Sequence, residues 1–319
     1  MLQAITNLSD RTTTLLIKFL RQFLLVCATV LSIESLRTLA LSIPISQQTI
    51  RKDVGVDNSN FIEFATCPKC HAIYPKPDVV GGIIDRCSFV RWPRHPQRRK
   101  RRPCNTLLYR GGNRTPKMVY CCRPVSQYLR DMVIDSDFLS KCNFWRERNT
   151  RDGFLADIYD GQTWKSEENV YLSSRYNLYG IMNVDWFQPF KHTSYSVGAI
   201  YMVILNLPRA ERFKEENVLL LGLMPGPKEP KLNLNTYLRP IVDDLLSLAD
   251  GKHFQDCSHT GNIYSFSLLT CSSDLPATRK LGGFLSFHAK HGKSTELATH
   301  LSFLYSNIDI MHQSTIHIH

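Results

Sequence analysis

Residues 178–185 read Leu-Tyr-Gly-Ile-Met-Asn-Val-Asp, a short apolar run that ends in an acid. An apolar run of this length, bounded by polar residues, predicts a buried β-strand. Similar runs follow at residues 197–207, 218–224 and 264–271. Between the third and fourth runs, apolar residues recur at helical spacing over residues 234–248. The predicted order is therefore strand, strand, strand, helix, strand.

This order matches the first five elements of the ribonuclease-H-like fold. There the first and fourth strands are parallel neighbours, joined by a right-handed crossover through the helix. Asp185 ends the first strand and Asp274 follows the fourth, so the fold would bring both carboxylates into one site. Paired carboxylates hold Mg²⁺ or Mn²⁺, and two such ions catalyse phosphoryl transfer. The alternative is that each aspartate only caps a strand end or belongs to a turn.

The composition is that of a basic globular chain. Its 319 residues are 43% apolar and carry 39 Lys and Arg against 28 Asp and Glu, a net charge of +11. These values exclude a disordered chain, a collagen and a small disulfide scaffold. No Gly-rich phosphate loop, Gly-x-Ser-x-Gly elbow or His-Glu-x-x-His pair occurs in the sequence, which argues against an NTPase, a serine hydrolase and a zinc protease.

Much of the positive charge lies in a basic run at residues 91–102, which contains no acid. Such a run attracts phosphate backbones or serves as a nuclear import signal; the alternative is a solvated loop that does neither. Trp92 stands inside the run, where it could stack on a base. The predicted DNA-binding residues are Arg98, Arg99, Lys100, Arg101 and Arg102.

The cysteines predict a zinc site. Cys67-Pro-Lys-Cys70 places two thiolates around one tight turn, and Cys87 and Cys104 can complete a tetrahedral shell. Four other side chains could replace either of the distant pair: His71, His95, Cys121 and Cys122. The alternative is a set of ordinary reduced cysteines. Because the spacing suits metal ligands and no signal peptide precedes it, we expect a reducing compartment.

The N-terminal region, residues 1–60, is predicted to be helical and to end in a polar connection. Residues 15–33 are apolar enough to suggest a membrane span, but Lys18 and Arg21 interrupt them and would be unfavourable there. Apolar side chains from Leu16 to Cys27 recur on one helical face. We therefore expect a helix that packs on a core or on a partner, with a membrane anchor as the alternative.

Several motifs resemble the transposases of CACTA-type (En/Spm-like) mobile DNA elements. The resemblance covers roughly residues 60–285 and is most specific at two places, Pro225-Gly-Pro-Lys228 and Asp274-Leu-Pro-Ala277. It implies a metal-dependent DDE catalytic domain in which Asp185 is the first acid and Asp274 the second. Family members are also similar at Cys67-Pro-Lys-Cys-His71, which supports zinc.

The sequence also departs from the family pattern. Trp186 stands where many members have glycine directly after the first acid. After Gly292 the chain has neither the Cys-x-x-Cys insertion nor the later catalytic glutamate of the family, and Glu296 is too close to Asp274 to replace it. The third catalytic acid is therefore absent from the printed sequence, and we expect a truncated copy that does not catalyse strand transfer.

The expected fold is a partial ribonuclease-H-like α/β core, preceded by a zinc-binding module and a helical segment. The predicted parts are an N-terminal helical segment (1–60), a Cys-rich basic zinc module (61–125), a helical connector (126–170), the partial core (171–291) and an aberrant tail (292–319).

The expected function is that of a transposase-derived nuclear protein whose ancestral activity was metal-dependent DNA strand cleavage and transfer. The alternatives are a non-catalytic zinc-dependent DNA-binding or partner-binding protein and, less favoured, a protein anchored in a membrane through residues 15–33. The expected ligands are structural Zn²⁺ and ancestral Mg²⁺ or Mn²⁺. DNA is the expected partner, self-association is a further option, and no small-molecule substrate is expected.

Overall fold

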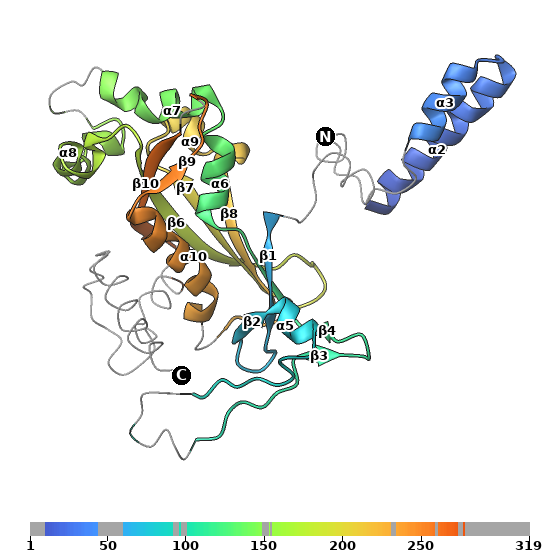
Figure 1. Cartoon of the computed structure of the whole chain (residues 1–319), viewed down its shortest axis with the longest axis horizontal. Coiled ribbons are helices and arrows are strands. Elements are labelled where there is room, and N and C mark those ends of the chain that lie inside the picture. The colour runs from blue at the N-terminus through green and yellow to red at the C-terminus, as the bar shows by residue number, and fades with distance from the viewer. Residues whose placement is uncertain are drawn as a thin grey trace. The chain divides into compact units, whose positions relative to one another are not determined.

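The computed structural model describes residues 10–43, 60–91, 96, 101–148, 153, 155–230, 234–258, 261–273 and 277. The chain divides into two compact units, one ending at Asn60 and one beginning at Phe61 (Figure 1). The predicted tail at residues 292–319 lies outside the described residues, and the predicted domain boundaries stay predictions.

The N-terminal unit is a pair of helices, α2 (Asp10–Val30) and α3 (Glu34–Ser42), that pack on each other. The prediction of helix is confirmed here. The buried side chains are the small residues Ala28 and Ala40, whereas Phe19 and Phe23 are 71% and 54% exposed. Most of the predicted apolar face is therefore exposed in this unit. No helix among the described residues is long and apolar enough to cross a bilayer.

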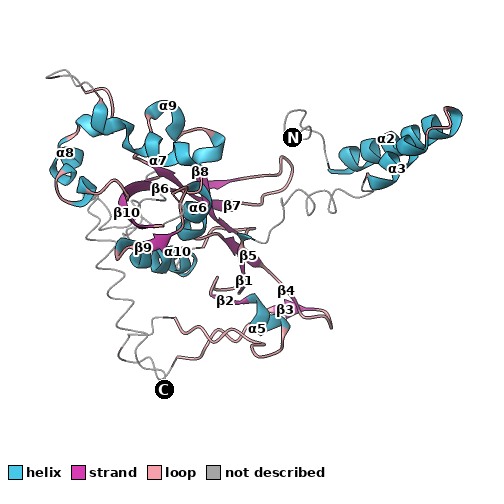
Figure 2. Ribbon diagram, turned by 45° about the horizontal axis from the view of Figure 1, so that its top comes forward, coloured by secondary structure: helices cyan, strands magenta, loops and turns pink. Residues whose placement is uncertain are grey.

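The second unit is built on one mixed sheet of eight strands in the order β2-β1-β5-β8-β7-β6-β10-β9 (Figure 2). A separate two-stranded ribbon pairs β3 with β4. The strand bounds are β1 Ile62–Thr66, β2 Ile73–Pro75, β3 Tyr109–Arg110, β4 Thr115–Pro116, β5 Val119–Cys122, β6 Asn177–Phe187, β7 Val197–Ile204, β8 Val218–Met224, β9 Lys252–Phe254 and β10 Asn262–Ser272.

The four predicted strands and the predicted helix are confirmed as β6, β7, β8, α10 (Leu234–Ala249) and β10. The second strand ends at Ile204, earlier than expected. β6, β7 and β8 are antiparallel neighbours, and β10 returns after α10 to lie parallel to β6. In that parallel pair Ser272 is in register with Asn183, so the first and fourth strands run side by side as predicted.

Helices on one face of the sheet enclose the main core. α6 (Val125–Met132), α7 (Ser136–Asn143) and α10 pack their apolar sides against the strands (Figure 1). Asp244 of α10 accepts hydrogen bonds from the N–H and Oγ of Ser126, at 2.9 and 2.5 Å, and so holds the start of α6. The remaining short helices are α5 Lys76–Val80, α8 Gln162–Glu168, α9 Arg209–Arg212 and single 3₁₀ turns at Phe144–Glu147, Ile158–Asp160, Tyr171–Ser173 and Glu215–Asn217.

The Cys-rich segment extends the same sheet rather than standing apart from it. β5 pairs with β8 through Cys121 and Cys122, and β1 pairs with β5. The predicted zinc module thus shares backbone hydrogen bonds with the predicted core. This pairing stabilises residues 61–125 independently of any metal ion.

Gly222 allows that junction to close. A Cβ at this position would lie 2.6 Å from the hydroxyl oxygen of Tyr120, which is fully buried on β5. We predict that Gly222→Ala lowers the free energy of unfolding by about 1–3 kcal/mol, the usual effect of overpacking a core. Chemical denaturation measures this. Gly112→Ala is the matched control, because a Cβ there meets nothing within 4 Å; equal effects of the two substitutions would contradict the prediction.

Candidate functional site

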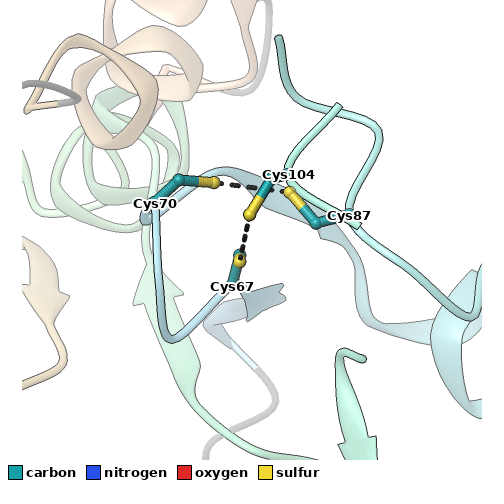
Figure 3. A group of neighbouring side chains, drawn as sticks. All are labelled: Cys67, Cys70, Cys87 and Cys104. Atoms are coloured by element: carbon teal, nitrogen blue, oxygen red, sulfur yellow. Dashed lines mark hydrogen bonds between the residues drawn. The ribbon is translucent and has the colours of Figure 1, made fainter. Parts of the chain in front are cut away.

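Four cysteines converge at one end of the second unit. The Sγ atoms of Cys67, Cys70, Cys87 and Cys104 all lie within 4.8 Å of one another (Figure 3). The sulfur atoms of Cys70 and Cys87 are 3.3 Å apart, and those of Cys67 and Cys104 are 3.8 Å apart. These are the four residues that the spacing singled out.

Two backbone turns present the sulfurs to each other. After β1, the N–H of His71 donates to the carbonyl of Cys67 at 2.9 Å, and His71 adopts a left-handed φ of 62°. On the opposite side, the N–H of Cys104 donates to the carbonyl of Phe89 at 2.8 Å, and Cys87 exchanges hydrogen bonds with Asn105 and Thr106, which follow Cys104. Local hydrogen bonding thus holds each pair of cysteines in place.

The charges in this cluster favour a bound cation. Hydrogen bonds from Cys70 and Cys87 lower the pKa of the Cys67 thiol, while the same contacts raise the pKa of Cys70 and raise that of Cys87 to about 11. One thiolate is therefore stabilised by neighbouring thiols that stay protonated, because a second negative charge so close is unfavourable. A divalent cation removes that repulsion. Four sulfur donors, buried or half-buried, fit the donor set of a structural metal site.

The alternative ligands for this site are engaged elsewhere or lie apart from it. The Nδ1 atom of His71 is 2.9 Å from the hydroxyl oxygen of Tyr237 on α10. Cys121 and Cys122 belong to β5 and are not members of the cluster. His95 lies outside the described residues. Among the residues described, the cluster of four cysteines can therefore hold a metal ion without any of them.

The contact of His71 also ties the cysteine turn to the core. Tyr237 is fully buried, and its carbonyl accepts a hydrogen bond at 2.8 Å from the hydroxyl of Tyr120. The two tyrosine rings meet edge to face, with 4.9 Å between their centroids. This connection could not be predicted from the sequence, because His71, Tyr120 and Tyr237 come from three distant segments: the cysteine turn, β5 and α10.

Asp185 stands near the end of β6 with its side chain exposed. Its Oδ1 accepts a hydrogen bond from the N–H of Trp186 at 2.7 Å. Asn183 lies on the same face of the strand and pairs across the sheet with Tyr201. Burial raises the pKa of Tyr201, and the negative charge of Asp185 adds to that shift. The C-terminal end of β6, which lies between β7 and β10 in the sheet, is therefore a polar surface.

The residue that directly follows β10 lies beside Val184, the residue before Asp185. The Oγ of Ser273 accepts a hydrogen bond from the N–H of Val184 at 3.0 Å. Asp274, the second predicted acid, lies outside the described residues, and so its pairing with Asp185 stays a prediction.

The basic run is described only in part. Arg98, Arg99 and Lys100 lie outside the described residues. Arg101 donates from Nη1 to the carbonyl of Arg91 at 3.5 Å, and Arg102 is exposed. A cavity beside the cysteine cluster is lined by Arg91 and Arg102 and also by Lys69 and Lys228. The sequence did not predict that Lys69 and Lys228 lie together, because they come from segments far apart in the chain.

Comparison with known families agrees with the predicted ancestry. Residues 152–310 match the model of the transposase family tnp2. This match supports a transposase-derived protein. No curated protein matches the chain significantly.

The transposase-like segment, residues 152–310, contains the strands β6 to β10 and helix α10. Both predicted acids lie in it, whereas the four cysteines lie before it. The segment runs beyond Gly292, where the sequence was expected to depart from the family. The more specific placement among CACTA-type transposases stays a prediction.

Proposed function

We propose that the chain is a transposase-derived DNA-binding protein with a partial ribonuclease-H-like core. The observation that carries this proposal is the strand order β8-β7-β6-β10, with β10 parallel to β6 after the helix α10, inside the transposase-like segment. Asp185 lies at the end of the first strand of that order. DNA is the substrate class that this ancestry supports.

We further propose Asp185 and Asp274 as the remnants of a site for Mg²⁺ or Mn²⁺. The exposed carboxylate of Asp185 is a hard oxygen ligand, and Asn183 and Tyr201 add polar groups on the same face. When bound, such ions activate a water or a 3′-hydroxyl and stabilise the leaving oxygen. The chain's own residues would hold these cations at the end of β6 and orient the DNA backbone beside them.

A second candidate is a zinc-dependent DNA-binding or partner-binding protein that has no catalytic activity. The observation that favours it is the cysteine cluster, which is complete within the described residues. Zn²⁺ is the ion that best suits four sulfur donors. Bound there, it would stabilise the turn after β1, from which His71 contacts Tyr237 on α10. Under both candidates we propose that the protein is nuclear and that the basic run is its import signal.

A strand-transfer assay separates the two candidates. The full chain is incubated with Mn²⁺ and DNA ending in terminal inverted repeats, and Asp185→Ala and Asp185→Asn are compared with the control Asp243→Asn, an exposed acid on α10. Activity that both Asp185 variants abolish would support a working acid site. We expect no strand transfer, as the departures from the family pattern indicate. DNA binding that Mn²⁺ strengthens in the wild-type chain but not in the Asp185 variants would support the first candidate. DNA binding that the Asp185 variants leave unchanged, with or without Mn²⁺, would support the second candidate.

A further inference from the structure

A cavity of about 480 Å³ lies between the cysteine turn and the loop that follows β8. Residues 68–71 form one wall and residues 227–229 form another. Its volume falls within the range of about 300–1,000 Å³ typical of small-ligand sites. Cys70 and Cys104 of the cysteine cluster are among its lining residues, whereas the acid at the end of β6 is not.

The rim of the cavity is cationic. Lys69, Arg91, Arg102 and Lys228 line it, against the single acid Glu229, and all five residues are exposed. Arg91 and Arg102 are also the first and last cations of the basic run. An excess of positive charge around a concave surface attracts anions such as phosphate groups. The cavity therefore lies where the basic run joins the cysteine module.

The interior of the cavity is apolar. Phe89 and Met118 line it as half-buried side chains, together with Pro68 and Pro227. Sites that bind single-stranded nucleic acid combine positive charge along the backbone with an aromatic ring on which an unpaired base stacks. Bases in a duplex are already stacked on their neighbours and cannot enter such a site.

The two key walls are held firmly. The backbone of Phe89 is held by the hydrogen bond from the N–H of Cys104, one of the four clustered cysteines, to its carbonyl. On the other wall, the N–H of Ser196 donates to the carbonyl of Pro227 at 3.0 Å, and a Cβ on Gly226 would lie 2.4 Å from the carbonyl oxygen of Ser196. Lys228 thus projects from a loop that packs closely on the chain before β7.

We propose that this cavity binds one nucleotide of single-stranded DNA. Phe89 stacks on the base, and Lys69, Arg102 and Lys228 contact the flanking phosphates. The proposal rests on the proposed function for DNA as the substrate class and adds recognition of an unpaired strand, such as the end that strand separation exposes. Charge alone would favour any polyanion; the half-buried aromatic ring is what favours an unpaired base.

The test compares two probes on the zinc-loaded full chain. The probes are fluorescein-labelled oligothymidylate of about twelve nucleotides and a duplex of the same length, and anisotropy measures the Kd of each. We expect Phe89→Ala to weaken oligothymidylate binding about 5- to 150-fold, the range for loss of one stacked base, with duplex binding within about twofold of wild type. Phe89→Tyr should keep the wild-type affinity for oligothymidylate. Lys228→Gln should weaken that binding, whereas the control Lys252→Gln on β9 should not.

Three results would overturn the proposal. The first is an unchanged affinity of Phe89→Ala for oligothymidylate, and the second is an equal loss for both probes in a variant that keeps its zinc content and melting temperature. With either of these results, binding of the duplex by the wild-type chain would still support the proposed function. The third is binding of neither probe by the wild-type chain, which would remove the proposed function as well.

Discussion

Cys67→Ser is expected to abolish stoichiometric zinc binding and to lower the melting temperature by about 10 °C or more. The four sulfur atoms lie within 4.8 Å of one another, so losing one leaves an incomplete shell. Structural zinc contributes several kcal/mol to folding, and each kcal/mol corresponds to about 2–4 °C in a chain of this size. Elemental analysis of the purified protein and thermal unfolding with and without a chelator measure the two effects.

The matched control for this prediction is Cys257→Ser. Cys257 is exposed and lies outside the cluster, so its replacement should change neither zinc content nor stability. Wild-type protein without stoichiometric zinc would contradict the prediction. So would a Cys67→Ser variant that retains zinc and melts with the wild type.

The second large effect is expected on DNA affinity when alanine replaces Arg98, Arg99, Lys100, Arg101 and Arg102. Each lysine or arginine that neutralises a DNA phosphate adds about 0.9 to the slope of log K against log salt. If all five contact the backbone, the slope should become flatter by about 4.5, and affinity at low salt should fall by orders of magnitude. Anisotropy titrations of a duplex at several salt concentrations give the slope directly.

A variant in which the four arginines become lysine is the control, because it keeps the charge and should keep the slope. An unchanged slope in the alanine variant would mean that the basic run does not contact the duplex and serves nuclear import or no binding function.

Much of the core could be predicted from the sequence because its elements are long and strongly patterned. β6, β7, β8 and β10 are buried runs of 7 to 11 residues, and α10 has helical periodicity over 16 residues. Four such strands and one helix permit few topologies, since crossovers between parallel strands are right-handed. The cysteine set was predictable for a different reason: Cys67 and Cys70 share one local turn, which limits the geometry of their partners.

The rest of the fold depends on contacts between distant parts of the chain. β1, β2 and β5 have only 3 to 5 residues each, too few to show a period, and they join the sheet through the pairing of β5 with β8. The sequence makes His71 a candidate ligand, but in the fold its Nδ1 atom lies beside the hydroxyl of Tyr237. The cavity likewise brings together Lys69 and Lys228, which are separated by half of the chain. Such juxtapositions leave no trace in local composition.

The pair of N-terminal helices shows the same limit. The periodicity predicted a helix correctly, and it also identified an apolar face. The helices contact each other through small residues such as Ala28 and Ala40, because short side chains let two helices approach closely. Helical periodicity identifies which side chains share a face but does not identify what that face contacts.

The most direct test of the central claim is the binding of duplex DNA by the zinc-loaded full chain. Anisotropy should show binding at low salt, with log K falling linearly as log salt rises, as expected for contacts to the phosphate backbone. Chelation of the metal should weaken that binding, because the cysteine module carries the basic run. A zinc-loaded, folded protein that binds no duplex at low salt would contradict the account.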